Sequence, residues 1–191
     1  IGSGTSDNGV KDDDDFTIIS ARSGSAGVLI YVTPGDSAKT IADKVNAQLG
    51  KTGVYASAKT TTTLALTASG TVSFELNGTT ASASVTNVND LSSLVSEINA
   101  KTGQTRVIAT ASGAPPSVII LTSADGSDIQ IKNGTTSVSM TIDGASVSPD
   151  NSIVIGGQLR FESRQNEAFT IIGSEALLGG ASLASTQGSN P

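Results

Sequence analysis

The chain has 191 residues, a formal net charge of −6 at pH 7, and neither cysteine nor histidine. The missing side chains exclude disulfides, thiolate and imidazole metal ligands, and the nucleophile–base pairs that depend on cysteine or histidine. The acidic balance argues against a nucleic-acid or anionic-membrane surface, and no apolar run approaches the roughly 20 residues that a membrane span requires.

The first fifteen residues are rich in Gly, Ser, Asn and Asp and end in four aspartates, at 12–15. Repulsion between like charges favours an extended, solvated linker in this segment. A calcium loop is the alternative interpretation, but the spaced Asp-x-Asp-x-Asp-Gly order and the terminal Glu of such loops are missing. The chain begins with Ile1 and shows no secretory signal, so we expect an internal fragment of a longer protein.

The segment 16–70 predicts two hairpins separated by a helix. Its strand patterns lie at 16–19, 28–32, 54–58 and 64–67. The turn at 23–25 joins the first two strands, and the threonines at 60–63 lie between the last two. Ser37 suits the N-cap of the helix, and Gly50 suits its end.

The next segment contains the clearest amphipathic helix, at 89–103. Its apolar stripe consists of Leu91, Leu94, Val95 and Ile98. Asp90 is placed to cap the N-terminus, and Gly103 is placed to end the helix. Strand patterns surround it at 72–76, 81–85, 106–111 and 118–122, with the hairpin turn Asn77-Gly78 between the first two.

Residues 37–47 align with residues 90–100 at a shift of 53 positions. Ala38, Ile41 and Val45 correspond to Leu91, Leu94 and Ile98, and the pair Asn46-Ala47 corresponds to Asn99-Ala100. The strand pattern at 54–58 also corresponds to that at 107–111. We interpret the match as an internal duplication.

After the second repeat the chain predicts short strands and one helical turn. The strand patterns lie at 129–131, 138–142, 152–155, 158–162 and 168–172, and the helical turn lies at 175–178. Turn residues separate these strands at 133–134, 143–144 and 156–157. The final residues, 181–191, are typical of a linker.

Together these patterns predict an α+β fold of duplicated small units. Each unit consists of antiparallel β hairpins packed with one helix, and a mostly β C-terminal portion follows them. The predicted segments are a linker at 1–15, a first unit at 16–70, a second unit at 71–132, a β-rich portion at 133–180 and a linker at 181–191.

Two carboxylate pairs are candidates for acid–base chemistry, Asp125 with Asp128 and Glu162 with Glu167. The first pair is more simply a turn, because Asp and Gly favour turn conformations. The second pair, with Arg160 and Arg164, is expected on an exposed hairpin face. No nucleophile elbow, dinucleotide loop or phosphate loop is present. We therefore predict no catalytic, cofactor-binding or metal-binding residue and no cofactor.

The duplicated unit resembles the repeat found in the outer (D2/D3, hypervariable) region of bacterial flagellins and in hook-associated proteins. The matching residues are the strand at 73–78, the helix end at 97–103 (Glu-Ile-Asn-Ala-Lys-Thr-Gly) and the closing segment at 120–129. The likeness spans 73–132 and 16–70 and is general beyond 133. The opening residues, 1–6, look like the point at which a flagellin chain leaves its filament-core domain.

The resemblance implies a non-enzymatic structural domain exposed on the outside of the extracellular flagellar filament, with a role in antigenic variation. Its implied partners are other flagellin subunits, bound through core domains that this chain lacks. One alternative is the stalk domain of a filament cap or hook-associated protein. Another is an adhesion module that binds host or surface glycans through the loops at 22–27, 112–117 and 156–157.

Overall fold

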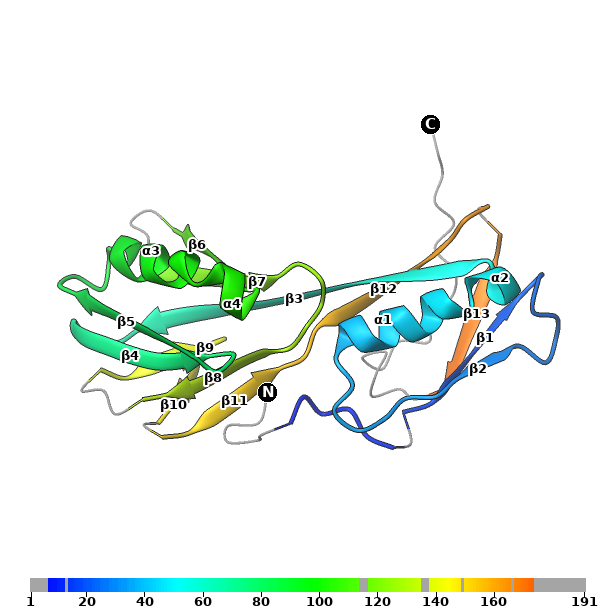
Figure 1. The fold of residues 1–191 in the computed structure, drawn as a ribbon, viewed down its shortest axis with the longest axis horizontal. Coiled ribbons are helices and arrows are strands. Elements are labelled where there is room, and N and C mark those ends of the chain that lie inside the picture. Colours follow the sequence, from blue (N-terminus) through cyan, green and yellow to red (C-terminus); the bar gives the residue numbers. More distant parts are fainter. Residues whose placement is uncertain are drawn as a thin grey trace. The chain divides into compact units, whose positions relative to one another are not determined.

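The computed structural model of the chain describes residues 7–12, 14–113, 117–134, 138–148, 150–165 and 167–173. In these ranges the chain is mostly β, with thirteen strands in three antiparallel sheets and four short helices (Figure 1). It divides into two compact units. Unit 1 consists of Ile1–Asn8 and Lys59–Gly157, and unit 2 consists of Gly9–Ala58 and Gln158–Pro191.

The predicted α+β class, with duplicated hairpins that each carry one helix, is wrong. Strands contribute far more residues than helices, and they pair across long stretches of sequence rather than only within local hairpins. Strands that follow residue 133 are distributed over all three sheets. Local periodicity identified most of the strands, but it carries no information about which distant strand each one pairs with.

Unit 2 contains a three-stranded sheet with the order β13-β1-β2. Its strands are β1 (Phe16–Ser20), β2 (Val28–Ile30) and β13 (Phe169–Gly173). Phe16 pairs with Ile30 on one side and with Gly173 on the other. The predicted first hairpin is therefore confirmed, and its central strand also pairs with a strand from near the end of the chain.

The remaining elements of unit 2 are α1 (Ala38–Ala47), α2 (Leu49–Thr52), β12 (Gln158–Ser163) and the first residues of β3 (Val54–Leu66), with which β12 pairs. Ser37 caps α1, because its side chain accepts a hydrogen bond from Thr40 N at 3.2 Å. Ile41 and Val45 of α1 are buried in a core that also contains Phe16 and Phe161. Residues from both ends of the sequence thus form one hydrophobic core.

Unit 1 contains the longer sheet path β10-β9-β3-β7-β6 and the four-stranded sheet β11-β8-β4-β5. The first path uses the later part of β3 with β6 (Ile108–Ser112), β7 (Val118–Ser123), β9 (Met140–Ile142) and β10 (Ala145–Val147). The second sheet consists of β4 (Gly70–Leu76), β5 (Thr79–Val85), β8 (Ile129–Asn133) and β11 (Ser152–Ile155). The predicted pairing of β4 with β5 is confirmed. The structure also pairs β6 with β7.

The core of unit 1 combines the inward side chains of its strands with the helix α3 (Ser92–Ala100), which α4 (Thr102–Thr105) follows. The predicted apolar stripe is confirmed by Leu91, Leu94 and Ile98, which are fully buried. Leu91 lies at the N-cap position, just before the helix, so Asp90 is not the N-cap residue. Instead Asp90 accepts hydrogen bonds from Ser92 N and Oγ.

The hairpin predicted across the threonines at 60–63 is wrong, because β3 runs without interruption from Val54 to Leu66. Threonine is β-branched and favours strands, and no Gly, Pro, Asn or Asp interrupts the segment 54–66. Thr60 and Thr62 are buried within this strand. The run of threonines is therefore part of a long strand rather than a turn.

Gly50 and Gly103 do not end the helices at which they were predicted to act. They lie in the one-turn helices α2 and α4, which extend each helical segment. The residues with left-handed backbone come three positions later, at Gly53 (φ 67°) and Arg106 (φ 59°). The predicted helix at 175–178 and the linker at 181–191 lie outside the described residues.

Candidate functional site

Asp125 and Asp128 bind different partners. Asp125 Oδ1 accepts hydrogen bonds from Ser123 Oγ and Ser127 N, both at 3.0 Å. Such bonds from an aspartate to residues of its own turn are typical of the predicted turn, which is confirmed. Asp128 Oδ2 accepts a hydrogen bond from Asn8 Nδ2 at 2.7 Å. The two carboxylates therefore stabilise a turn and an N-terminal contact of unit 1.

The Asp128 carboxyl group gives unit 1 a pH-dependent contribution to stability. Burial raises its pKa, and the hydrogen bond from Asn8 opposes this effect. Its second oxygen, Oδ1, is buried and has no hydrogen-bond partner among the residues that the structure describes. Folding thus favours the protonated carboxyl, and this stabilisation is lost as the pH rises through the raised pKa.

We expect Asp128→Asn to raise the melting temperature at pH 7, because a neutral amide replaces a partly buried carboxylate. The difference from the parent protein should shrink toward zero near pH 3, where Asp128 is protonated in the folded and unfolded states. Thermal melts between pH 3 and pH 8 measure this dependence. The exposed Asp12→Asn variant is the control, and an Asp128→Asn effect that is independent of pH would contradict the prediction.

Glu162 and Glu167 also bind separate partners. Glu162 accepts a hydrogen bond from the Tyr55 hydroxyl and pairs with Arg160, whose Nε lies 2.7 Å from Glu162 Oε1. The hydrogen bond to Glu162 raises the pKa of Tyr55. Glu167 pairs instead with Arg22, with Nε and Oε2 3.5 Å apart. These partly exposed ion pairs contribute little stability individually. The Arg160–Glu162 pair lies within β12, whereas the Arg22–Glu167 pair joins the turn after β1 to the segment after β12.

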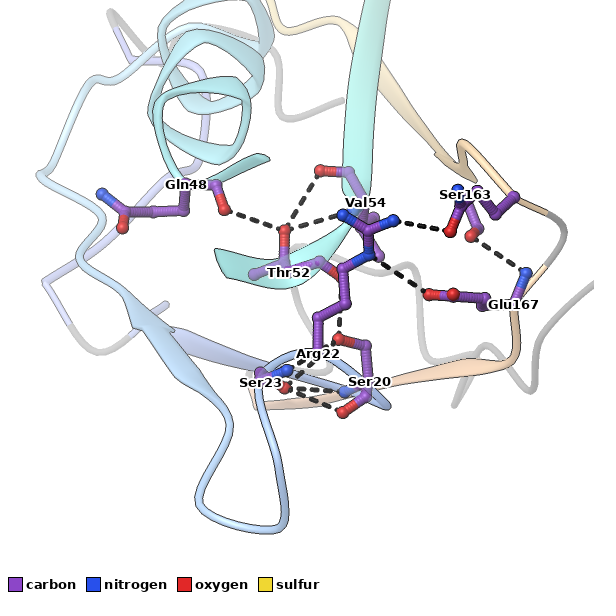
Figure 2. A network of polar contacts seen from close by, with 9 residues as sticks. Ser20, Arg22, Ser23, Gln48, Thr52, Val54, Ser163 and Glu167 are labelled. Atoms are coloured by element: carbon purple, nitrogen blue, oxygen red, sulfur yellow. Dashed lines mark hydrogen bonds and ion pairs between the residues drawn. The ribbon is translucent and has the colours of Figure 1, made fainter. Parts of the chain in front are cut away.

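Figure 2 shows a polar network that joins three segments of unit 2: the turn after β1, the end of α2, and the turn after β12. Ser20 Oγ donates a buried hydrogen bond to Thr52 O at 2.7 Å. Arg22 Nη2 donates to Gln165 Oε1 at 2.6 Å, beside the ion pair with Glu167. The network holds together segments that lie far apart in the sequence.

An analogous contact occurs in unit 1, at the turn between β4 and β5. Asn77 Nδ2 donates to Thr105 O at 2.8 Å, as Ser20 does to Thr52 O. Asn77 also exchanges two hydrogen bonds with Gln130, its N donating to Gln130 O at 2.9 Å and its Oδ1 accepting from Gln130 N at 2.7 Å. Asn77 therefore joins the β4–β5 turn to α4 and β8.

An asparagine near the end of α1 and an asparagine near the end of α3 make equivalent hydrogen bonds to the strand that follows each helix. Asn46 Nδ2 donates to Ala56 O and its Oδ1 accepts from Ala56 N, both at 2.9 Å. Asn99 makes the same two bonds to Ala109, at 2.9 and 2.8 Å. The sequence showed the repeated Asn-Ala pair, but the role of the asparagine, which binds a strand ten residues later, was missed.

The threonine that ends each helical segment follows the same pattern. Thr52 Oγ1 donates to Gln48 O at 3.1 Å and accepts from Val54 N at 3.1 Å. Thr105 Oγ1 donates to Lys101 O and accepts from Val107 N, both at 3.2 Å. Each threonine therefore fixes the left-handed turn that leads from the helix into the strand.

These left-handed turns predict opposite effects for two substitutions. Arg106→Gly should raise the free energy of unfolding by up to about 1 kcal/mol, since an L-residue is strained in this conformation. Gly53→Ala should lower it by about 1 kcal/mol or more, because the added Cβ would also lie 2.9 Å from Arg22 Cδ. Urea unfolding measures both effects. Gly50→Ala is the control, since Gly50 has open space and lies in a helix, and it should not destabilise the protein.

Two of the aspartates at 12–15, Asp14 and Asp15, accept hydrogen bonds from backbone amides. Asp14 Oδ2 accepts from Lys11 N at 2.8 Å, and Asp15 Oδ1 accepts from Val32 N at 2.6 Å. Asp13 lies outside the described residues. Within the described ranges, no three Asp or Glu residues form a group that could hold a metal ion.

The three loops considered for glycan contact belong to different units. Residues 22–27 lie in unit 2, whereas 112–117 and 156–157 lie in unit 1. Residues 114–116 of the second loop are outside the described ranges. Among the helices that the structure describes, none is long and apolar enough to cross a membrane.

The polar networks described above connect turns, helix ends and strand edges. Residues 8–70 match the family of the flagellin hook IN motif. The matched segment comprises 63 of the 191 residues. No curated protein matches the chain. The match ends at residue 70 and does not include the second predicted repeat.

Proposed function

We propose that the chain is a non-enzymatic structural domain of flagellin, exposed on the outside of the flagellar filament. The observation that carries this proposal is the match of residues 8–70 to the flagellin hook IN motif. The acid pairs considered for catalysis support it as well, because their carboxylates bind turn residues, Asn8, Tyr55 and arginines. The surface loops of such a domain are the parts expected to vary between antigenic types.

We further propose that residues 71–132 contain a second copy of the motif. The two hydrogen bonds from Asn46 to Ala56 recur between Asn99 and Ala109. The hydrogen bonds of Thr52 recur at Thr105. Recurrence of this local geometry at a constant sequence shift supports duplication of the helix–turn–strand segment, although the sheets around the two copies differ.

Antibody labelling of intact flagella tests the proposed location. Antibodies raised against the isolated chain should decorate the filament along its whole length. Labelling confined to the distal tip would favour the cap, and labelling confined to the junction with the hook would favour a hook-associated protein. Labelling of dissociated subunits without labelling of intact flagella would contradict exposure on the outside.

A glycan-binding role is a separate proposal with a separate test. A glycan array probed with the isolated chain would show saturable binding if the loops at 22–27, 112–117 or 156–157 form an adhesion surface. The structural proposal predicts no saturable binding. Replacement of the exposed loop residues by Gly and Ser is the control for specificity.

A further inference from the structure

Two strands of unit 1 lie at sheet edges beside helix α3. β5 is the terminal strand of the four-stranded sheet, and β6 is the terminal strand of the path β10-β9-β3-β7-β6. Figure 1 shows α3 next to both strands. An edge strand presents N–H and C=O groups that can pair with a strand of another chain, so open edges favour association.

The edge of β6 is occupied by side chains from the helical segment. Asn99 binds both the N–H and the C=O of Ala109, as a neighbouring strand would. Thr102 Oγ1 donates to Val107 O at 2.9 Å. Hydrogen-bonding direction alternates along a strand, so Ala111 also directs its backbone groups away from β7.

The edge of β5 is occupied in the same way from the other side of α3. Glu97 Oε1 accepts a hydrogen bond from Ser82 N at 3.3 Å. Ser93 Oγ donates to Ser84 O at 3.3 Å. Ser82 and Ser84 are two residues apart, so both direct their backbone groups away from β4. One helix thus provides hydrogen-bond partners to the edges of two sheets.

We propose that α3 closes these two edges against pairing with a strand from a second copy of the chain. Its polar side chains take the place of a neighbouring strand, so that copies held at high local concentration do not join through their sheets. Asn46 has the equivalent role in unit 2, where it binds the N–H and C=O of Ala56 on β3. The inference concerns the isolated chain and does not depend on the proposed location in a filament.

Asn99→Ala tests this inference at β6. The substitution frees the N–H and C=O of Ala109, and two new interchain hydrogen bonds per edge should raise the association constant by about tenfold or more. Sedimentation velocity of the full chain over a concentration series measures association. A folded Asn99→Ala variant that associates no more strongly than the parent protein would overturn the proposal.

Two further variants separate an open edge from general destabilisation. Leu121→Ala truncates a fully buried side chain on the interior strand β7 and frees no backbone group of an edge strand, so it should destabilise the protein without promoting association. Adding Ala111→Pro to Asn99→Ala removes an edge N–H from an exposed residue and should restore the parent behaviour. Equal association of Leu121→Ala and Asn99→Ala, or no effect of the proline, would overturn the proposal.

The edge of β5 provides a second test if Asn99→Ala shows no cooperative unfolding. Ser93 is exposed and Glu97 is half-buried, and neither belongs to the hydrophobic core, so Ser93→Ala with Glu97→Ala should leave the core intact. This double variant should also associate more strongly than the parent protein. Unchanged sedimentation of the folded double variant would overturn the role of α3 at β5.

Discussion

Ile98→Asp is expected to abolish cooperative folding of unit 1. The Ile98 side chain is fully buried in the core that the strands of unit 1 share with α3. Replacing it with a carboxylate removes apolar contacts and buries a charge without a partner, which should cost about 4 kcal/mol or more. Such a loss is comparable with the whole stability of a small domain.

The distribution of aromatic residues allows the two units to be followed separately. The only two tyrosines, Tyr31 and Tyr55, belong to unit 2, and the chain has no tryptophan. In Ile98→Asp, the far-UV circular dichroism signal of unit 1 should be lost while the tyrosine fluorescence transition remains. The exposed Ser96→Asp on the same helix is the control. Unchanged circular dichroism melting of Ile98→Asp would contradict the packing of α3 on the sheets.

Phe161→Ala is expected to have the second largest effect, on unit 2. The Phe161 and Phe16 rings meet edge to face, with centroids 5.8 Å apart and planes at 80°. Removing a buried phenyl ring from a core typically costs about 3–5 kcal/mol. The double-mutant cycle with Phe16→Ala should give a coupling energy of about 0.5–1.5 kcal/mol. Tyrosine fluorescence during urea unfolding measures these effects.

Phe74→Ala provides the matched control, because Phe74 is a buried phenylalanine of unit 1. It should change the circular dichroism transition and leave the tyrosine transition in place. Zero coupling between Phe16 and Phe161 would contradict a core shared by the two ends of the chain. It would then follow that β12 does not pack against β1.

Local patterns in the sequence were sufficient to predict most strands and the two longer helices, α1 and α3. The turn Asn77-Gly78 illustrates the reason: both residues have positive φ, at 47° and 78°, and these residue types favour that conformation. The buried stripe of α3 likewise followed from helical spacing. In each case the physical cause lies within a few neighbouring residues.

The fold class was predicted incorrectly because its determinants are not local. Phe16 pairs with Gly173 and packs on Phe161, contacts that no periodicity near residue 16 indicates. The threonines of β3 were interpreted as a turn, although they have high strand propensity, because a hairpin fitted the assumed repeat. The assumption that each repeat folds by itself therefore caused both errors.

The polar contacts were only partly predictable. The Asp125 turn followed from the sequence, whereas the pairing of Glu167 with Arg22 depends on a contact between segments distant in the chain. Asn46 and Asn99 had a visible signal, since the Asn-Ala pair recurs at the same shift as the apolar residues. Their function required the structure, because it depends on where the next strand places Ala56 and Ala109.

The most direct test of the proposed filament role is to replace residues 16–173 with a short Gly-Ser linker in cells that make the protein. Electron microscopy and analysis of the culture medium then show whether subunits assemble. We expect filaments that form but lack part of their outer density. Loss of filaments, with flagellin released into the medium, would contradict a dispensable outer domain and favour a function in the filament cap or the hook junction.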